Sequence, residues 1–340
     1  MEQQNNICVL WEKIDGNSAR ILRVYAAEPT VRLPDTIGDI TVTEIGDYCF
    51  ATHAGPCGNF ERTVLFYDDR KDKWESKDAT DEDMAGFREL CGDYLSKISL
   101  PRGLLRLGNL AFYNCTSLER IRFGARLCNI GSDAFMNCKR LHRLEVCCSV
   151  TQKSGVRQIL AQVYWDIEVA FLLEDGISAI IFYPEYYESY DEIAPAHIFG
   201  RKIEGEGFRA RLSFQDEVAD LAQYDKIFPR ACVEETKRTL LTLACTRLRY
   251  PVGMTLEARE RYQTYVGGHE TEAAEALIRE KNLVDFHYFL KEKLITQVGI
   301  QAAIETASSM EWAEGISELL HFKQEFFGRT KQERYAFDAF

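Results

Sequence analysis

The sequence predicts an α/β solenoid of short parallel strands, followed by a mainly α-helical C-terminal domain. Two observations predict the solenoid: an apolar pattern recurs at an offset of 23 residues, and its units share the order Ile/Leu-Gly-x-x-Ala-Phe. The third observation is a helical spacing of apolar residues from about Pro229 onward. We therefore expect a solenoid over 1–150, an α+β connecting domain over 151–228 and a helical domain over 229–340.

The repeat is clearest in two neighbouring units. Residues 107–112 read Leu-Gly-Asn-Leu-Ala-Phe, and residues 130–135 read Ile-Gly-Ser-Asp-Ala-Phe. The same offset pairs Cys115 with Cys138 and Leu118 with Leu141. A period in the twenties with this pattern is typical of a leucine-rich repeat solenoid, in which each unit adds one strand and a return segment. Parallel crossovers are right-handed, so we expect a short right-handed coil whose apolar positions stack on the next unit.

Three runs of sequence carry a resemblance to a known family. They are Val42-Thr43-Glu44-Ile45-Gly46, Ile98-Ser99-Leu100-Pro101 and Ile130-Gly131-x-x-Ala134-Phe135-x-x-Cys138-x-x-Leu141. Over roughly residues 20–147, the chain resembles the BspA-type, or treponemal, leucine-rich repeats of gut and oral bacteria. The resemblance implies a bacterial protein with a parallel-strand solenoid used for adhesion or protein binding, and many members are secreted or surface-bound. It also implies an inward-facing, packing role for Cys115 and Cys138, and Cys49 takes the small position before Phe50.

Other segments of the first half depart from the repeat. Residues 19–26 and 31–33 look like a hairpin that caps the open end of the solenoid. Residues 51–94 form an insertion rich in charged side chains, which we expect to be a solvated loop. Residues 151–174 show a helical apolar spacing, whereas residues 208–214 alternate and predict a strand. A small α+β or hairpin element is therefore expected over 168–214.

The C-terminal part predicts a bundle or a row of helical hairpins. The candidate helices are 230–249, 255–267, 270–281, 283–293, 297–307 and 311–326. The last four weakly resemble degenerate ankyrin repeats in spacings such as Ala273 to Leu277 and Ala313 to Leu319. The Thr-Pro-Leu-His segment typical of that family is missing.

Composition excludes several classes of protein. The net charge of −12 argues against a general binder of nucleic acid or anionic membranes. The sequence contains no run of eighteen apolar residues, so we expect no membrane-spanning helix. Residues 1–8 lack a basic start followed by an apolar stretch, so we expect no secretory signal and a cytoplasmic protein. The eleven cysteines include no CxxC pair and are expected to be reduced thiols.

The candidate binding site lies on the predicted strands. In each unit, the residues flanking the middle apolar position point to the exposed sheet face. They form one column of Lys97, Arg120 and Arg143 and a second of Ser99, Arg122 and Glu145, with His142 at the rim. Strands about 4.8 Å apart would place the three cations side by side, where they repel one another. That repulsion favours an acidic partner, while a solvated sheet face is the alternative.

Motifs for cofactors and catalysis are weak or missing. Cys49, His53 and Cys57, with Cys91 before the next unit, are possible zinc ligands, but their spacing is not a usual one, so we expect no metal. Residues 205–210 fit G-x-G-x-x-A, but a strand is expected after them where a dinucleotide site needs a helix. The acidic and aromatic run 182–192 is either a recognition surface or a packed strand and turn. With no catalytic signature in the chain, we expect no enzyme and no cofactor.

The leading hypothesis is a non-enzymatic module that binds an acidic protein partner through the exposed strand face. The residues expected to bind it are Lys97, Arg120, Arg122, Arg143, His142 and Glu145. One alternative is an enzyme or ligand-binding C-terminal region that uses the repeats as a targeting arm, with Tyr186, His197 and Arg209 near its site. A second alternative is a surface adhesin whose leader has been trimmed. Neither the oligomeric state nor the partner's identity follows from the sequence.

Overall fold

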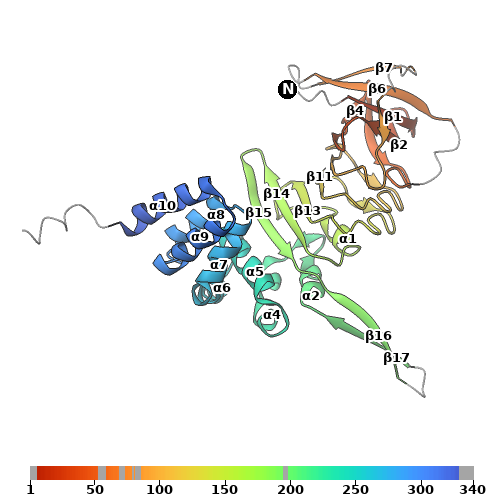
Figure 1. Ribbon diagram of the computed structural model, residues 1–340. Coiled ribbons are helices and arrows are strands. Elements are labelled where there is room, and N and C mark those ends of the chain that lie inside the picture. Colours follow the sequence, from red (N-terminus) through yellow and green to blue (C-terminus); the bar gives the residue numbers. More distant parts are fainter. Residues whose placement is uncertain are drawn as a thin grey trace, which may run out of the picture. The chain divides into compact units, whose positions relative to one another are not determined.

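The computed structural model describes residues 6–52, 59–68, 73–78, 80, 86–193 and 198–328. The chain divides into two compact units, Met1–Arg230 and Ala231–Phe340. The first unit contains the β-sheets and the second contains a series of helices (Figure 1). The helix α4 (Phe228–Glu234) spans the boundary between the two units.

The first unit is built around two large sheets. Sheet A has the strand order β12-β10-β5-β2-β1-β6-β7, with β4 on β5 and β8 on β2. Its strands are β1 (Asn6–Lys13), β2 (Ser18–Ala26), β4 (Thr36–Ile37), β5 (Ile40–Ile45), β6 (Glu61–Asp68), β7 (Lys73–Asp78), β8 (Arg88–Glu89), β10 (Arg106–Leu107) and β12 (Asn129–Ile130). Sheet B has the order β15-β14-β13-β11-β9-β3. Its strands are β3 (Thr30–Arg32), β9 (Lys97–Ser99), β11 (Arg120–Gly124), β13 (Arg143–Cys147), β14 (Ile167–Leu173) and β15 (Gly176–Tyr183).

Each repeat gives one strand to sheet B and the next strand to sheet A. Strand β9 is followed by β10, and β11 is followed by β12. Neighbouring coils pair in parallel and in register, so that Ile98 lies beside Ile121 and Ile121 beside Leu144. All three side chains are buried between the sheets. The predicted solenoid of parallel strands is therefore confirmed.

Phenylalanine and cysteine side chains stack along the solenoid core. The rings of Phe50 and Phe112 lie 4.7 Å apart, and those of Phe112 and Phe135 lie 5.6 Å apart. Beside this stack, the Cys115 thiol donates to the Phe50 carbonyl at 3.1 Å, and the Cys138 thiol donates to the Phe112 carbonyl at 3.0 Å. Both cysteines are fully buried, which confirms their predicted packing role. Burial raises the pKa of both thiols, so these cysteines are poor nucleophiles.

Glycines allow adjacent coils to approach closely at the turn after sheet A. A Cβ at Gly108 would lie 2.4 Å from the backbone of Gly46, and a Cβ at Gly131 would lie 2.4 Å from the backbone of Gly108. Backbone atoms cannot move aside as a flexible side chain can. The glycine in the Ile/Leu-Gly-x-x-Ala-Phe pattern is therefore fixed by the distance between coils.

This contact gives a test of the coil spacing. We expect Gly131→Ala to lower the free energy of unfolding of the first unit by about 1–3 kcal/mol, because the added methyl group overpacks a backbone contact. The measurement is a urea titration followed by hydrogen-exchange mass spectrometry, on peptides from the first unit. Gly16→Ala is the control, because a Cβ there meets no atom within 4 Å. Equal stability of the two variants would contradict the argument.

The N-terminal end differs from the expected hairpin of residues 19–26 and 31–33. Strand β2 pairs antiparallel with β1 and parallel with β5, whereas β3 joins β9 in sheet B. The prediction was wrong because residues 31–33 belong to the repeat pattern itself. The expected solvated loop over 51–94 was also wrong in part, since β6 pairs with β1 and β7 pairs with β6 to extend sheet A. Residues 53–58, 69–72, 79 and 81–85 lie outside the described residues.

The region after the repeats also differs from the predictions. Residues 151–174 form only the short helix α1 (Val156–Leu160), and the chain then enters β14, which pairs in parallel with β13 and extends sheet B. Residues 208–214 were expected to be a strand, but most of them lie in the helix α2 (Gly207–Arg211). The predicted hairpin element is present as β16 (Tyr187–Ile193) and β17 (Ile198–Glu204), which project as an arm (Figure 1). The unit ends with β18 (Phe214–Gln215), β19 (Val218–Ala219) and α3 (Leu221–Asp225).

Two glutamines of the α1 region cover the last strand of sheet A. The Gln158 side chain accepts from the Ile130 N–H at 3.1 Å and donates to the Cys128 carbonyl at 2.8 Å. Gln162 accepts from the Ala134 N–H at 2.8 Å and donates to the Gly131 carbonyl at 3.0 Å. Side-chain amides thus satisfy main-chain groups that another coil would otherwise pair with.

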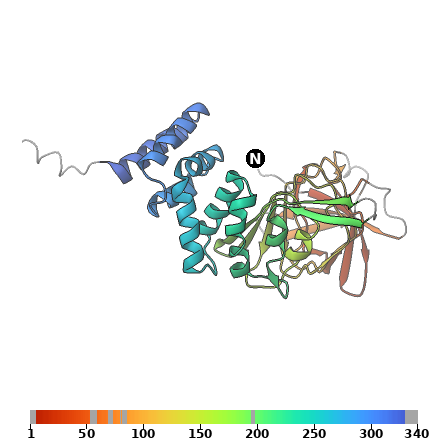
Figure 2. The same cartoon turned by 90° about the horizontal axis from the view of Figure 1, so that it is seen from below.

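The second unit consists of helices that follow one another along the chain (Figure 2). They are α5 (Lys237–Arg249), α6 (Leu256–Gly268), α7 (Glu270–Arg279), α8 (Leu283–Lys291), α9 (Gln297–Ser309) and α10 (Ala313–Phe327). The predicted helix 230–249 is divided, because Thr236 caps α5 by accepting from the Thr239 N–H. The helical C-terminal region is confirmed, whereas the resemblance to ankyrin repeats stays a prediction.

Candidate functional site

The predicted cation column is present on the outward face of sheet B. Lys97 pairs in register with Arg120, and Arg120 pairs with Arg143. Two residues further along the strands, Ser99 lies beside Arg122, and Arg122 lies beside Glu145. Along each strand these residues alternate with residues that are buried in the core. Their side chains therefore point to the opposite face of the sheet. The structure therefore brings together the predicted site residues of the strands.

Carboxylates of the same chain neutralise part of this column. The Arg143 guanidinium lies 2.7 Å from the Glu168 carboxylate and 3.4 Å from Glu145. Arg120 lies 3.2 Å from Glu145, and the Lys97 amine lies 4.0 Å from Glu119. The repulsion expected between stacked cations is thus relieved within the chain. Glu145 is a charge partner of two arginines, which makes it a positioning residue for them.

Arg122 differs from the column cations. Its side chain is exposed, and its Nε donates to the Cys147 sulfur at 3.4 Å. Among the described residues, no carboxylate lies within 4 Å of its guanidinium. His142 is exposed just before β13, where its Nδ1 contacts the Arg140 carbonyl at 2.8 Å. Arg122 is therefore the predicted residue with the most charge left to offer a partner.

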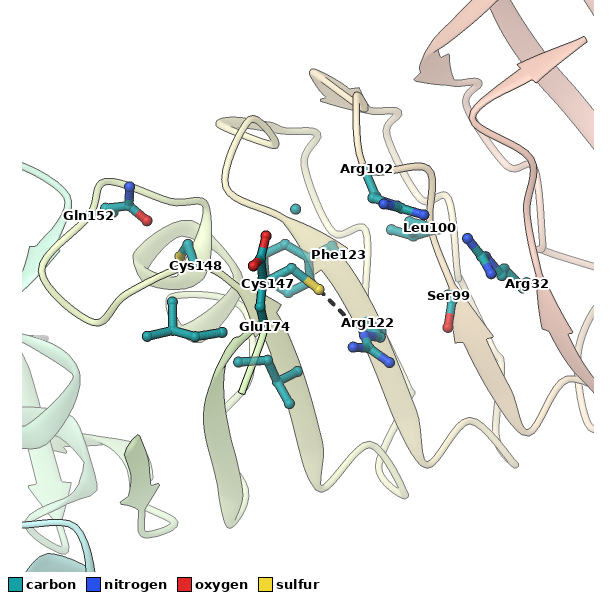
Figure 3. Close-up of a pocket in the computed structure, with 13 residues that line it drawn as sticks. Arg32, Ser99, Leu100, Arg102, Arg122, Phe123, Cys147, Cys148, Gln152 and Glu174 are labelled. Atoms are coloured by element: carbon teal, nitrogen blue, oxygen red, sulfur yellow. Dashed lines mark hydrogen bonds between the residues drawn. The ribbon is translucent and has the colours of Figure 1, made fainter. Parts of the chain in front are cut away.

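A cavity of about 530 Å³ opens at the C-terminal ends of the strands of sheet B. Figure 3 shows Arg32 at one end, Arg102 and Arg122 next to it, then Glu174 beside Cys147, and Cys148 and Gln152 beyond them. Arg32 donates to the Tyr67 hydroxyl at 3.2 Å, and its guanidinium lies 5.2 Å from the centre of the Tyr67 ring. Arg102 lies 3.4 Å from the Asp35 carboxylate in an exposed pair.

The floor of the cavity is apolar. Leu100 and Phe123 contribute to it, and their exposed fractions are only 5% and 1%. Leu172 and Leu173, at the end of β14, form a wall, and Leu173 is 47% exposed. The volume lies within the range of roughly 300–1,000 Å³ typical of ligand sites. The site therefore combines cationic groups with an apolar surface that is open to solvent.

Sequence reasoning found Arg122 but missed the rest of this cavity. Arg32 pairs in register with Ser99, yet 67 positions separate them because the insertion interrupts the repeat offset. Arg102 lies in the loop after β9, outside the strand columns. Glu174 follows β14, which the apolar spacing had assigned to a helix. The offset of 23 residues could have identified Arg32 only after the inserted residues had been left out of the interrupted unit.

The other candidate site residues from the sequence either have structural roles or lie outside the described residues. Cys49 is buried in the solenoid core, and His53 and Cys57 lie outside the described residues. Among the residues that the structure describes, no group of three His, Cys, Asp or Glu side chains is placed to hold a metal. The G-x-G-x-x-A segment does lead into α2, but a Cβ at Gly207 would lie 2.0 Å from the Pro184 carbonyl oxygen. The chain itself occupies the space that a phosphate would need.

The aromatic run and the alternative site near Tyr186 are divided between packing and exposure. Tyr183 is buried against Tyr224, whereas Tyr187 and Tyr190 are 55% and 63% exposed on the β16–β17 arm. The Tyr186 ring packs against Phe208. The run therefore includes both a packed part and an exposed part.

The polar groups near the alternative site are engaged within the fold. Arg209 forms an ion pair with the buried Glu206 at 2.6 Å. Arg211 is buried and donates to main-chain carbonyls, including that of Trp165 at 2.7 Å. His197 lies outside the described residues.

Comparisons with known proteins agree with the repeat geometry. Residues 86–155 match the family model described as BspA type Leucine rich repeat region, in six copies. Residues 86–155 form a BspA-type leucine-rich repeat region. The matched BspA-type segment contains β9 to β13 and therefore the whole predicted cation column. The register of β3 on β9 and of β5 on β10 continues the same coil before the matched residues.

A search of solved structures finds a leucine rich cell surface protein from Faecalibacterium prausnitzii A2-165. It is 18% identical over a match that covers 50% of this chain, with a TM-score of 0.24. The match spans 42% of that protein's chain, which is less than half of its length. No curated protein matches the sequence. Of the helices in the described part of the chain, none has the length and apolar character needed to cross a membrane.

Proposed function

We propose that this protein is a non-enzymatic interaction module that binds an acidic protein partner through the outward face of sheet B. The BspA-type repeats suggest a protein-interaction or surface-binding role, since stacked repeats offer an extended surface. The chemistry of the partner is inferred from the charges on that surface. The catalytic motifs weighed in the sequence are missing, which agrees with a binding role.

An excess of positive charge on this face supports the acidic partner. The outward strand positions carry five basic side chains and two acidic ones. The basic residues are Arg32, Lys97, Arg120, Arg122 and Arg143, and the acidic ones are Glu145 and Glu168. The whole chain carries a net charge of −12, so this basic face opposes the general trend. A local field of this sign steers acidic surfaces toward the sheet and repels basic ones.

Arg122 carries the proposal, because its guanidinium is exposed and has no carboxylate within 4 Å in the described part of the chain. Arginine donates in a planar fork that fits a carboxylate with two parallel hydrogen bonds. Arg120 and Arg143 already use their forks on Glu145 and Glu168. They contribute to the field of the face, while Arg122 can form a new ion pair.

Charge reversal at Arg122 tests the proposal. We expect Arg122→Glu to weaken the complex with the partner at least about tenfold, equivalent to about 1.4 kcal/mol, because an attractive pair becomes repulsive. The partner is captured from native lysate with the full chain, purified, and titrated against wild type and variant by calorimetry at low and high salt. The wild-type affinity is expected to fall as the salt concentration rises.

The matched control is Arg126→Glu, which makes the same charge change at an exposed residue outside the cavity. It is expected to leave the affinity within about twofold of wild type. Equal binding by Arg122→Glu and wild type, or an affinity that does not change with salt, would contradict an acidic partner on this face. The cytoplasmic location expected from the sequence is proposed along with this function, and cell fractionation with an antibody to the chain tests it.

A further inference from the structure

The cavity at the ends of the sheet B strands brings three arginines to one side of a space that is open to solvent. Arg32 ends β3, Arg122 lies on β11, and Arg102 follows β9, so each comes from a different coil (Figure 3). Each guanidinium presents donors in a fixed plane, which suits the two oxygens of a carboxylate. The group most available to a ligand is Arg122, whose Nε contacts the thiol of Cys147.

The remaining charges in the cavity leave the arginine end electropositive. Arg102 pairs with Asp35, but the two side chains are 68% and 44% exposed, so this ion pair contributes little. The Asp35 carboxylate also accepts from the Arg102 main-chain N–H at 2.6 Å, so a ligand anion would share the guanidinium with Asp35. Glu174 lies beside Cys147, on the far side of Arg122 from Arg32, and has no ion-pair partner among the described residues (Figure 3). An anion is therefore favoured near the arginines and disfavoured near Glu174.

The apolar residues of the cavity add a second requirement on the ligand. Leu100 and Phe123 are already buried, so the apolar surface that a ligand can cover is that of the half-buried Leu172 and of Leu173, which is 47% exposed. Covering these groups with an apolar side chain removes them from water and favours binding. A volume of about 530 Å³ accommodates a few residues and not a folded domain. One carboxylate next to an apolar side chain fits this arrangement, while a chain of phosphates would meet Glu174.

We propose that this cavity is a subsite for a peptide carboxylate that is adjacent to an apolar residue. The carboxylate contacts Arg122 and Arg102, and the apolar residue packs on Leu172 and Leu173. The carboxylate belongs either to the C-terminus of a peptide or to an aspartate or glutamate side chain. The inference rests on the proposed function, because Arg122 belongs both to the cavity and to the basic face.

Cys147 provides a reporter inside the cavity. The full-length protein is alkylated with iodoacetamide, a neutral reagent, and modification of each cysteine is followed by peptide mass spectrometry. Cys147 lines the cavity and is partly exposed, whereas Cys128 is exposed and does not line it. The readout is the alkylation rate of Cys147 relative to Cys128, with and without peptide, compared within each variant.

Three short peptides serve as probes. The first ends in leucine with a free carboxylate, the second is its C-terminal amide, and the third is the amide with an aspartate before the leucine. At saturating concentration, we expect the first or the third to slow Cys147 alkylation about fivefold or more, with Cys128 unchanged. Protection by the first alone identifies a C-terminal carboxylate, and protection by the third identifies a side-chain carboxylate. The second peptide is expected to give none.

Variants separate the subsite from the rest of the face. Protection is expected to be lost in Arg122→Gln and reduced in Arg102→Gln, and to be kept in Arg126→Gln and Arg120→Gln, which lie outside the cavity lining. Four outcomes would overturn the proposal: no protection by any peptide, equal protection by the neutral amide, protection unchanged in Arg122→Gln, or stronger protection by inorganic phosphate than by either acid. Failure of the proposed function is read separately, from the affinity of the purified protein partner for Arg122→Glu.

Discussion

Arg211→Leu is expected to destabilise the first unit by about 3–5 kcal/mol, because it removes a buried cation that several main-chain carbonyls share. The Arg211 guanidinium donates to the carbonyls of Val163 at 2.8 Å, Trp165 at 2.7 Å and Gly207 at 3.0 Å, and also to that of Pro184. The side chain is 6% exposed. Burial lowers the pKa of Arg211 to about 10, so the group remains charged at neutral pH. Leucine would leave these carbonyls without donors and without access to water.

The effect is measured by a urea titration with hydrogen-exchange mass spectrometry, read on peptides around α2 and β14. Arg211→Lys is expected to recover part of the stability, since one ammonium group keeps the charge but cannot reach all the carbonyls. Arg126→Leu, at an exposed position, is the control and is expected to change stability by less than about 0.5 kcal/mol. A loss below about 1 kcal/mol in Arg211→Leu would show that water replaces the guanidinium.

Phe112→Ala is expected to have a comparable effect, with a loss of about 3–5 kcal/mol from the first unit. The ring is fully buried between Phe50 and Phe135, with centroid distances of 4.7 and 5.6 Å. Its removal opens a cavity in the middle of the stack, and the strands on both sides limit how far the neighbouring rings can move to fill it. The main-chain carbonyl that accepts from the Cys138 thiol is kept in this variant, so the expected loss comes from the ring alone.

The same titration tests this prediction, with the exchange rates of peptides 97–124 and 129–147 as the local readout. Phe60→Ala is the matched control, because Phe60 is 39% exposed and its removal leaves no enclosed cavity. Phe112→Leu is expected to fall between the alanine variant and wild type, since it restores apolar volume without the ring contacts. If the two alanine variants lost the same stability, the stack would not be the main source of cohesion between coils.

The repeat offset predicted the features that depend on translation from one coil to the next. An offset of 23 places Arg120 beside Arg143 and Cys115 in the position of Cys138, and the structure has both arrangements. These features follow from sequence because identical units must bury the same positions against each other. Glu168 broke the pattern, since it pairs with Arg143 at an offset of 25. A strand that joins the sheet after the last regular unit leaves no periodic signal.

The prediction of a strand over residues 208–214 was wrong for a different physical reason. Alternating apolar and polar residues favour a strand only when the polar ones reach solvent, but Arg211 is buried and binds carbonyls from distant segments. Those contacts form only in the folded unit, so no local pattern contains them. The charged insertion hid strands in a similar way, because the short buried run at Val64 and Leu65 is diluted by the charges around it.

Of the charged groups at the candidate site, the sequence predicted the cations but not their carboxylate partners. Lys97, Arg120, Arg122 and Arg143 share one face, as their spacing indicates. Their carboxylate partners could not be assigned from that spacing, because Glu119 lies just before β11, outside the strand columns, and Glu168 lies on β14, which joins the sheet at a different offset. The cavity depends on Arg102 and Glu174, which project from loops, and loop directions are set by contacts far away in the chain.

The amides of Gln158 and Gln162 have a consequence for how this array can grow or associate. An uncovered strand at the end of a solenoid is a template on which a further coil, or the first coil of another molecule, can pair. Here the donor and acceptor groups next to β12 are already engaged by side chains of the same chain. Sheet A is therefore closed at this end, whereas β14 and β15 continue sheet B. A longer relative would have to gain its additional coils by insertion upstream of residue 129, with the terminating segment carried along unchanged.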